Sequence, residues 1–413
     1  MKPLVDAQRT VLAAMEVFPS SAVPLADCLG LVLAEDVLAP HPVPPFANSA
    51  MDGYAVRAED VSSTPATLRV LEDVPAGSVA NSEVEPGTAI KIMTGAPIPG
   101  GADAIVIVED TQAADQSDQV VVLAPARVGD HVRGAGGDIE LGSTVLQAGI
   151  RLNPMHLGLL ASVGMAGPTV TRRPTVAVFS TGDELVPADT AGLRPGAIHD
   201  SNRPMLVAAL GELGANVLDL GIVPDDARLL RSVLGEAATN ADAVVTSGGV
   251  SMGEYDLVKQ VLSEMGRVEF WQVAMQPAKP FAFGFLGDTP LFGLPGNPVS
   301  GMVAFEQFVR PALLRRMGAS RLFRRRSSAV LATPVSTHPD KTVFVRVRTA
   351  MDSKGMTATS SGGQGSNILS ALAAADAFAV VPVGVGDLEA GATVELEWFR
   401  SPEMRTYEEA LGG

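Results

Sequence analysis

Cysteine is almost absent from this chain: Cys28 is the only one among 413 residues. A disulfide within the chain is therefore excluded, and a metal site built from protein thiolates is disfavoured. No apolar run is long enough to cross a bilayer, because the apolar stretch Val11 to Phe18 is interrupted by Glu16 and no small-residue cleavage site follows it. These absences predict a cytoplasmic protein with no membrane span.

Positive charge is scarce as well. The chain has 30 Lys and Arg residues against 46 Asp and Glu residues, a formal net charge of -16. Such a surface repels a polyanionic backbone, so nucleic-acid binding is not expected and any anionic ligand must meet local donors. The basic run Arg315 to Arg326 follows a predicted helix end, where cations are favoured, and we interpret it as a solvated link between domains.

Length and composition predict several domains. A chain of 413 residues exceeds what one core usually organises, and its 42 Gly and 30 Pro residues form no repeat, which indicates many tight turns. The prolines of segment 39–45 predict a stiff crossing between domains. We expect a discontinuous N-terminal linking domain (1–42 and 136–170), an inserted β-rich domain (43–135), an α/β domain (171–318) and a C-terminal β-barrel domain (319–413).

The α/β prediction rests on an alternation of patterns that begins near Thr175. Buried runs such as Val176–Phe179 and Ala243–Thr246 alternate with amphipathic stretches such as Ala227–Ala237. This alternation is typical of an open α/β sheet, in which ligands bind at the carboxyl ends of the strands. Beyond the basic run, period-two stretches such as Thr393–Trp398 predict the all-β unit.

A first glycine loop, residues 246–251, follows one predicted strand. Gly248 and Gly249 free backbone N–H groups to face an anion, and Ser247 and Ser251 add hydroxyl donors. Taken alone, the pattern favours an ordinary turn, because glycine pairs after strands are mostly turns.

A second glycine loop, residues 294–300, joins a strand to a helix. The N-terminus of a helix presents unpaired N–H groups and a partial positive charge, so Gly296, Asn297, Pro298 and Ser300 are candidates for phosphate binding. The alternative is that Asn297 only caps the helix, with Pro298 in its first turn. Two such loops at one sheet edge favour an anion site.

Carboxylates follow several of the same strands. Asp183 and Glu184 come after the first strand, Asp225 and Asp226 open a helix, and Asp256 follows the first glycine loop. Mg²⁺ prefers oxygen ligands and partners substrate phosphates, so the cluster predicts a magnesium site. For Asp225 and Asp226 a helix-capping role is an equal alternative.

In combination these blocks resemble a known family. NSAMDGYA, KIMTGAPIPGGADAIV, FSTGDEL, TSGGVSMGEYD, LFGLPGNPVS and SGGQGSNIL occur in the order found in molybdopterin molybdenumtransferases, the MoeA and gephyrin E-domain family, and they cover nearly the whole chain. The resemblance implies that the α/β domain (171–318) is of the molybdopterin-binding type. It also implies a homodimer in which the α/β and C-terminal domains of one subunit face the inserted domain of the other. The implied reaction joins molybdate to adenylylated molybdopterin with a divalent cation, expected to be Mg²⁺, and releases AMP.

The resemblance also assigns residues. It implies functional roles for Asp52, Thr94, Asp138, Glu184, Asp225 and Asp256. Of these acids, we expect Glu184, Asp225 and Asp256 to hold Mg²⁺. Asp52 and Asp138 would reach in from the partner subunit, where Asp52 could orient water or a leaving group.

For molybdate the matching donors are Lys279, beside Pro280, with Arg346 and Ser366. An arginine offers several fixed donors to an oxyanion, and a lysine adds a compact charge. Without the resemblance, Arg346 would be interpreted as a strand residue facing solvent. Because no cysteine lies near the site, the sulfurs that bind molybdenum must come from the pterin.

One departure from the family concerns charge. Many relatives carry basic residues after the tryptophan, where this chain has Gln272 and Gln276, which hydrogen-bond without charge. Two other functions stay open at this point: a molybdopterin adenylyltransferase, which would consume ATP without molybdate, and a non-enzymatic scaffold or oxyanion buffer. Possible partners are a molybdopterin adenylyltransferase and molybdoenzyme apoproteins.

Overall fold

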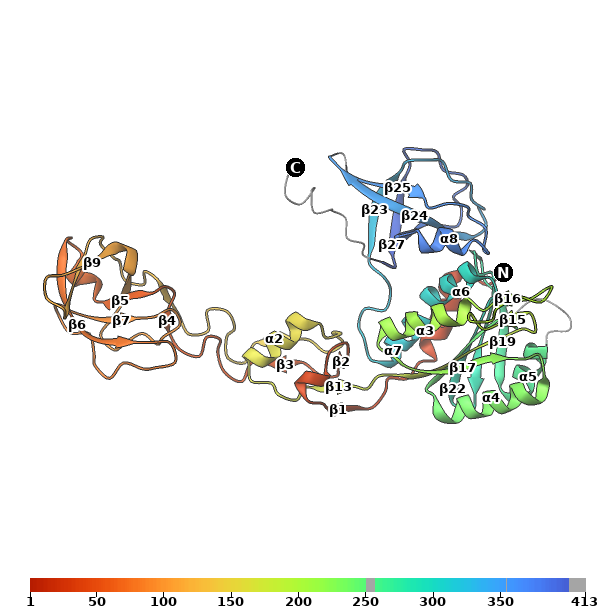
Figure 1. Cartoon of the computed structure of the whole chain (residues 1–413), viewed down its shortest axis with the longest axis horizontal. Coiled ribbons are helices and arrows are strands. Elements are labelled where there is room, and N and C mark those ends of the chain that lie inside the picture. Colours follow the sequence, from red (N-terminus) through yellow and green to blue (C-terminus); the bar gives the residue numbers. More distant parts are fainter. Residues whose placement is uncertain (250–256, 354, 401–413) are drawn as a thin grey trace.

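The structure, a computed structural model, describes residues 1–249, 257–353 and 355–400. Figure 1 shows separate units strung along an elongated molecule, with the β-rich inserted unit at one end and the α/β and C-terminal units at the other. Within the described residues, no helix combines the length and the apolar character needed to span a membrane. The domain boundaries given above stay predictions.

The linking unit is built from two segments far apart in the sequence. A three-stranded sheet has the order β1-β13-β2 and a second pair joins β12 to β3, and Cys28, Leu33, Leu160 and Val170 are among the buried residues that pack between them and helix α2. The elements are β1 Ser20–Ala22, η1 Leu25–Asp27, β2 Val32–Leu33, β3 Val37–Leu38, β12 Thr144–Leu146, α2 Pro154–Ser162 and β13 Thr169–Thr171.

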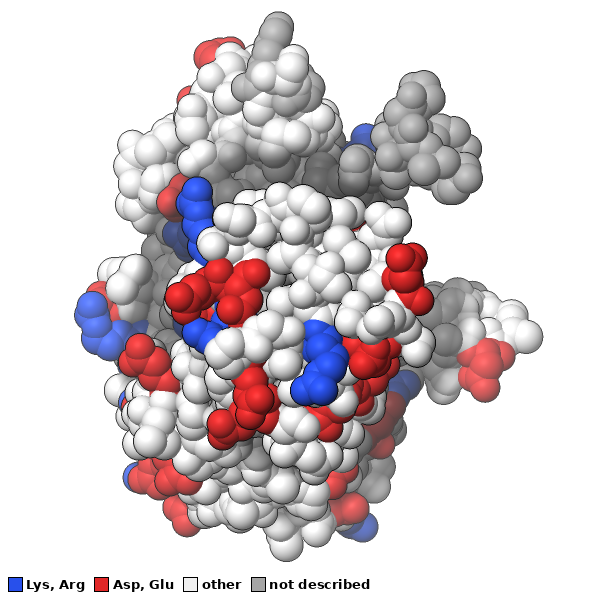
Figure 2. Space-filling view, turned by 90° about the vertical axis from the view of Figure 1, so that its left-hand side faces the viewer, with Lys and Arg blue, Asp and Glu red and all other residues white. Residues whose placement is uncertain are grey.

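The inserted unit is a six-stranded sheet of order β8-β5-β7-β6-β10-β9, beside a small pair of β11 with β4. Seen from this end of the molecule in Figure 2, Asp and Glu outnumber Lys and Arg on the visible face. Its elements are β4 Asn48–Ser49, β5 Gly53–Val56, η2 Ala58–Val61, β6 Ala66–Val74, β7 Thr88–Ile92, β8 Ala104–Ile107, η3 Val108–Asp110, β9 Thr111–Ala113, β10 Gln119–Val122 and β11 Val132–Arg133.

The α/β unit contains a six-stranded sheet of order β17-β14-β18-β22-β21-β19. The first four strands in this order are parallel, whereas β21 and β19 run antiparallel to their neighbours. Its strands are β14 Thr175–Thr181, β17 Asn216–Val223, β18 Ala243–Ser247, β19 Arg267–Gln272, β21 Pro280–Leu286 and β22 Thr289–Leu294, and a small pair joins β15 Leu185–Val186 to β16 Ile198–His199.

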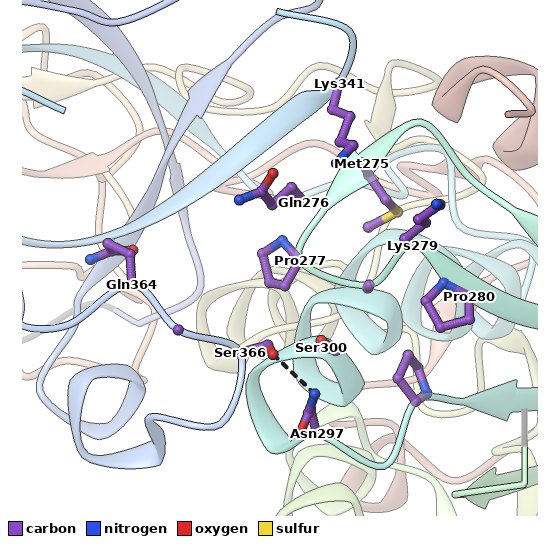
Figure 3. A pocket seen from close by; sticks show the side chains of 13 residues that line it. Met275, Gln276, Pro277, Lys279, Pro280, Asn297, Ser300, Lys341, Gln364 and Ser366 are labelled. Atoms are coloured by element: carbon purple, nitrogen blue, oxygen red, sulfur yellow. Dashed lines mark hydrogen bonds between the residues drawn. The ribbon is translucent and has the colours of Figure 1, made fainter. Parts of the chain in front are cut away.

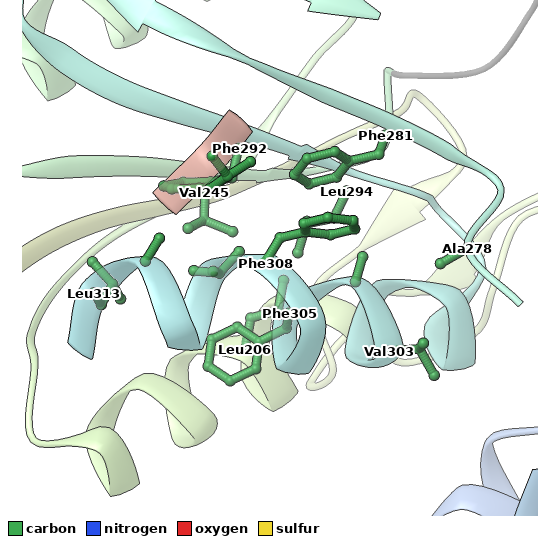
Figure 4. Packing of buried hydrophobic residues seen from close by; sticks show 14 of the residues in the cluster. Leu206, Val245, Ala278, Phe281, Phe292, Leu294, Val303, Phe305, Phe308 and Leu313 are labelled. Atoms are coloured by element: carbon green, nitrogen blue, oxygen red, sulfur yellow. The ribbon is translucent and has the colours of Figure 1, made fainter. Parts of the chain in front are cut away.

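Helices cover both faces of this sheet, because its central strands are apolar on both sides. Along β14, Val178 belongs to the cluster under α1, α3 and the α6–α7 helix, whereas Phe179 belongs to the cluster under α4 and α5. In Figure 4 the Phe281 ring stacks on Phe308 with a centroid distance of 4.2 Å. The helices are α1 Leu4–Ala13, α3 Asn202–Leu213, α4 Ala227–Asn240, α5 Leu257–Met265, α6 Pro298–Ala304, the π-helical turn η4 Phe305–Val309 and α7 Arg310–Arg316.

The C-terminal unit is a closed barrel. Its strands follow the order β24-β25-β23-β27-β26, and β26 pairs back with β24. β20 adds to β24 and so ties the barrel to the α/β unit. The fold class predicted from the sequence is confirmed. The elements are β20 Met275–Gln276, β23 Arg326–Leu331, β24 Thr342–Asp352, β25 Gly355–Ser360, α8 Leu369–Ala373, β26 Ala377–Val381 and β27 Thr393–Trp398.

Ion pairs join the barrel to the long α6–α7 helix. Arg324 donates two hydrogen bonds, of 2.9 and 2.8 Å, to Glu306, whose side chain is 1% exposed. Within the barrel, Arg326 donates from Nε and Nη2 to Oε2 of Glu397, at 3.3 and 3.1 Å. Burial lowers the pKa of nearby Arg310 to about 10. The interpretation of the basic run as a solvated link is therefore wrong for Arg324, which pairs with a buried carboxylate, whereas the side chain of Arg326 is 47% exposed.

Candidate active site

The carboxyl ends of β14, β18 and β22 lie at one edge of the sheet, and the loops after them are in contact. Gly248 has a φ of +96°, and a Cβ added there would lie 2.7 Å from the carbonyl oxygen of Thr181. The Gly248 N–H donates to the carbonyl of Leu294 at 3.0 Å. A Cβ on Gly296 would be 4.0 Å from the Gly248 Cα. The two glycine loops therefore lie against each other.

Ser247 and Gly249 of the first glycine loop are also closely packed. Ser247 is 3% exposed, and a Cβ on Gly249 would lie 2.4 Å from the Val258 side chain. Glycine is thus required by close packing as well as by the positive φ of +69°. Two predicted site residues, Ser251 and Asp256, lie outside the described residues.

The second glycine loop contacts the C-terminal barrel. Asn297 occupies the N-cap position of α6, but its side chain makes no capping hydrogen bond. Instead its Nδ2 donates to the Ser366 Oγ at 3.0 Å, as Figure 3 shows. The Val299 N–H donates to the Ser366 carbonyl at 3.1 Å, and Pro298 has no N–H to offer. The helix end thus binds the barrel loop and presents fewer backbone donors to a ligand than the sequence suggested.

A cavity of about 340 Å³ opens where this loop meets the barrel (Figure 3). Two lysines and no acid are among its described lining residues, so it is a locally positive site in an acidic protein. Gln276, which can hydrogen-bond but carries no charge, lines it as well. The full lining is Met275, Gln276, Pro277, Ala278, Lys279, Pro280, Pro295, Asn297, Ser300, Lys341, Gln364, Gly365 and Ser366.

Arg346 lies behind the barrel loop that borders the cavity. It is 0% exposed, so the interpretation of a solvent-facing strand residue is wrong. Its Nη2 donates to the carbonyls of Gly363 and Gly365 at 2.7 and 3.2 Å. Its buried Nε and Nη1 have no hydrogen-bond partner in the described structure, and burial lowers its pKa. An arginine with two unsatisfied buried donors is suited to an oxyanion.

Asp225 and Asp226, two neighbouring predicted acids, differ in their contacts. Asp226 caps α4, because its side chain accepts from Arg228 N and Leu229 N at 2.8 and 2.9 Å. These backbone hydrogen bonds lower the pKa of Asp226. Its neighbour Asp225 is not the cap, and the Asp225 N–H donates to Asp183 Oδ1 at 3.1 Å.

No group of three His, Cys, Asp or Glu residues that could hold a metal forms within the described part of the chain. A metal site made of protein ligands alone is therefore not seen there. Of the three predicted magnesium ligands, Glu184 and Asp225 are described and exposed.

Two residues at the site were missed by sequence reasoning. Lys341 lines the cavity from the start of β24, and a lone lysine before a strand gives no signal of this. Asn202, at the first position of α3, donates to the Ser247 Oγ at 2.8 Å and to the Gly296 carbonyl at 2.7 Å. The sequence His199 to Asn202, polar residues between a strand and a helix, carried a signal that could have been used.

The remaining predicted residues lie elsewhere in the chain. Asp52 Oδ1 accepts from Thr94 N at 2.7 Å and from Thr94 Oγ1 at 2.6 Å, which joins two blocks of the inserted unit. The Thr94 hydroxyl and N–H lower the pKa of Asp52. Asp138 lies beside the crossing between domains: its N–H donates to the Val43 carbonyl at 3.0 Å, and Val43 pairs with the next residue, Ile139. Within one chain the inserted unit is remote from the cavity (Figure 1).

Three family descriptions match the chain in order. Residues 2–164 match the MoeA N-terminal region (domain I and II), residues 177–315 a probable molybdopterin binding domain, and residues 328–399 the MoeA C-terminal region (domain IV). Molybdopterin molybdenumtransferase 2 of Mycobacterium tuberculosis is 41% identical over 96% of this chain and 99% of that protein. This chain belongs to the MoeA family of molybdopterin molybdenumtransferases.

Other members of the MoeA family support the assignment. The Haemophilus influenzae molybdopterin molybdenumtransferase is 37% identical over 91% of this chain and 93% of its own length. A crystal structure of a molybdopterin biosynthesis MoeA protein from Pyrococcus horikoshii has 30% identity and a TM-score of 0.82, covering 97% of this chain and 100% of that one. Both the family and the fold predicted from the sequence are confirmed.

Proposed function

We propose that this protein joins molybdate to adenylylated molybdopterin, cleaves the pyrophosphate link of that substrate with water, and releases AMP and the finished cofactor. The proposal rests on one arrangement: the two glycine loops contact each other, and a positive cavity lies next to them beneath the barrel. One substrate with a phosphate link and a second that is an oxyanion need two adjacent anion sites. Relatives over most of the chain are named molybdopterin molybdenumtransferases.

Each of the two sites would bind a different substrate group. We assign the substrate phosphates to the glycine loops, where Gly296 leaves space in front of the backbone and Ser247 offers a hydroxyl. The Gly248 N–H, expected to face the anion, is instead bonded to the Leu294 carbonyl. We assign molybdate to the barrel side of the cavity. There Ser366 offers a hydroxyl, and Lys279 supplies charge from the opposite, α/β side. The buried Arg346 does not line the cavity, and we propose that it reaches the oxyanion only if the loop of Gly363 and Gly365 shifts to expose its unsatisfied donors.

A magnesium ion would be held between protein and substrate. Glu184 and Asp225 offer oxygen ligands that suit Mg²⁺, and Asp256 is proposed as a third. We propose that substrate phosphate oxygens complete the coordination. The ion would supply charge neutralisation at the pyrophosphate. Glu184 and Asp225 would keep the link oriented against the glycine loops.

The site would be completed by a second copy of the chain. Asp52, Thr94 and Asp138 lie on or beside the inserted unit, which is remote from the cavity of its own chain. We propose a homodimer in which Asp52, held as a carboxylate by Thr94, orients water or the leaving group. We place the protein in the cytoplasm, with a molybdopterin adenylyltransferase and molybdoenzyme apoproteins as partners.

Purified protein tests the function directly. With adenylylated molybdopterin, Mg²⁺ and molybdate it should release AMP, and omission of molybdate should slow that release. ATP consumption that is independent of molybdate would instead show an adenylyltransferase. A protein that binds the substrates without releasing AMP would be a scaffold or an oxyanion buffer.

A further inference from the structure

Asn202 joins the two glycine loops through one side chain. It is 8% exposed, and its Nδ2 donates to the Ser247 Oγ at 2.8 Å and to the Gly296 carbonyl at 2.7 Å. A carbonyl oxygen only accepts, so the amide nitrogen must face Gly296. Both Nδ2 hydrogens are therefore used to connect the loop after β18 with the loop after β22.

The same segment also holds the end of β14. Ser180, the residue before the last one of that strand, donates from its hydroxyl to Asp200 Oδ1 at 3.1 Å. Asp200 is 4% exposed and accepts a further hydrogen bond from the Arg203 Nε at 3.0 Å. Residues 200–202 thus contact the carboxyl ends of three adjacent strands that carry the site.

The amide oxygen of Asn202 indicates independently that this residue has a role beyond stabilising the fold. Oδ1 is buried and has no hydrogen-bond partner among the described residues. A buried acceptor without a partner is destabilising, so fold stability alone does not explain an asparagine here. The same oxygen would repel a phosphate. Asn202 therefore acts on an anion only through the two loops that it holds.

We propose that Asn202 is a positioning residue that fixes the spacing of the two glycine loops and thereby sets the affinity for the AMP phosphate of the substrate. This inference rests on the proposed function. Asn202 also orients the Ser247 hydroxyl. Because the Ser247 oxygen accepts a hydrogen bond from Asn202, the hydroxyl hydrogen of Ser247 points away from Asn202 and can be donated to the ligand. Molybdate, on the barrel side of the cavity, does not depend on this contact.

The test is Asn202→Leu, which keeps a similar volume and removes both hydrogen bonds without adding charge. Binding of AMP in the presence of Mg²⁺ is measured by titration calorimetry on the full-length protein, and AMP release gives the KM for each substrate. The dissociation constant for AMP and the KM for adenylylated molybdopterin should rise about tenfold. The KM for molybdate should not change. The matched control is Asn216→Leu, the same substitution at the exposed start of β17.

A second arm tests whether the effect passes through the serine. Asn202→Leu and Ser247→Ala should be non-additive, the double variant losing less AMP affinity than the product of the single effects, because both disrupt one contact. Wild-type-like AMP affinity in Asn202→Leu would overturn the inference. A parallel loss of Tm, AMP affinity and molybdate dependence would also overturn it, as general damage.

The wild-type protein separates the two proposals. If it neither binds AMP nor releases it, the proposed function fails and this inference fails with it. If it does both while Asn202→Leu is indistinguishable from it, only the positioning role is wrong.

Discussion

Gly296→Ala separates a role in folding from a role in binding at the second glycine loop. Gly296 is exposed and its φ lies outside the left-handed region, so alanine can adopt its conformation. The nearest atom to the new Cβ would be the Gly248 Cα at 4.0 Å, an ordinary van der Waals contact. The methyl group would occupy the space in front of the backbone, where we place the substrate phosphates.

General magnitudes, applied to this geometry, give the size of both effects. Replacing a glycine in a compatible conformation stabilises a protein by about 0.4 to 1 kcal/mol, so the free energy of unfolding should be equal or slightly higher. A methyl group at a backbone contact would displace the phosphates by about 1 Å, and a misplacement of that size reduces kcat/KM by about a hundredfold. Activity and stability should therefore change in opposite directions.

Thermal unfolding and AMP-release kinetics measure the two effects on the same protein. Gly235→Ala is the matched control, because Gly235 lies in α4 with nothing within 4 Å of an added Cβ. It should gain stability and keep its activity. Gly248→Ala should lose about 1 to 3 kcal/mol of stability, since its φ is +96° and its Cβ would approach Thr181 O to 2.7 Å. Wild-type kcat/KM in Gly296→Ala would refute the placement of phosphate at this loop.

Four further outcomes are expected. Thr94→Val should raise the pKa of Asp52, because it removes a hydrogen bond that favours the carboxylate; an NMR titration of the Asp52 carboxyl carbon that shows no rise would contradict this. The Thr94 contact should hold at neutral pH and be lost as the pH falls through the lowered pKa of Asp52. Glu306→Gln should cost about 3 kcal/mol by leaving Arg324 with an uncompensated charge, seen as a lower Tm with the Asn216→Leu protein as reference. Lys341→Ala should raise the KM for molybdate, and an unchanged KM would exclude Lys341 from the oxyanion site.

Local pattern predicted the sheet and its loops well. Alternating buried and amphipathic segments are fixed by short-range periodicity, so β14, β18 and α4 formed where the sequence indicated. The Gly248–Gly249 pair located the first loop, because positive φ and close approach require glycine at both positions. The second loop was located by Gly296 and Pro298 before a helix, although Gly296 needs neither. What the pattern could not show is which loops touch. The spacing that Asn202 sets is a tertiary property.

Charge was harder to interpret from the sequence. Arg346 and Arg324 follow local patterns typical of solvated residues, yet the first is 0% exposed and the second pairs with a buried glutamate. Their environments come from segments 17 to 18 residues away in sequence, which periodicity does not report. Asn297 shows the same limit: it stands at an N-cap, but its side chain is taken by the barrel.

Subunit complementation tests the central claim, that one site is formed by the cavity of one chain and the inserted unit of another. Asp52→Ala and Lys279→Ala should each have little activity alone, since each lacks one half of every site. After the two proteins are mixed and allowed to exchange subunits, half of the dimers should be mixed and each should contain one intact site. AMP release should then recover to about a quarter of the wild-type rate. A mixture no more active than its components would contradict the shared site.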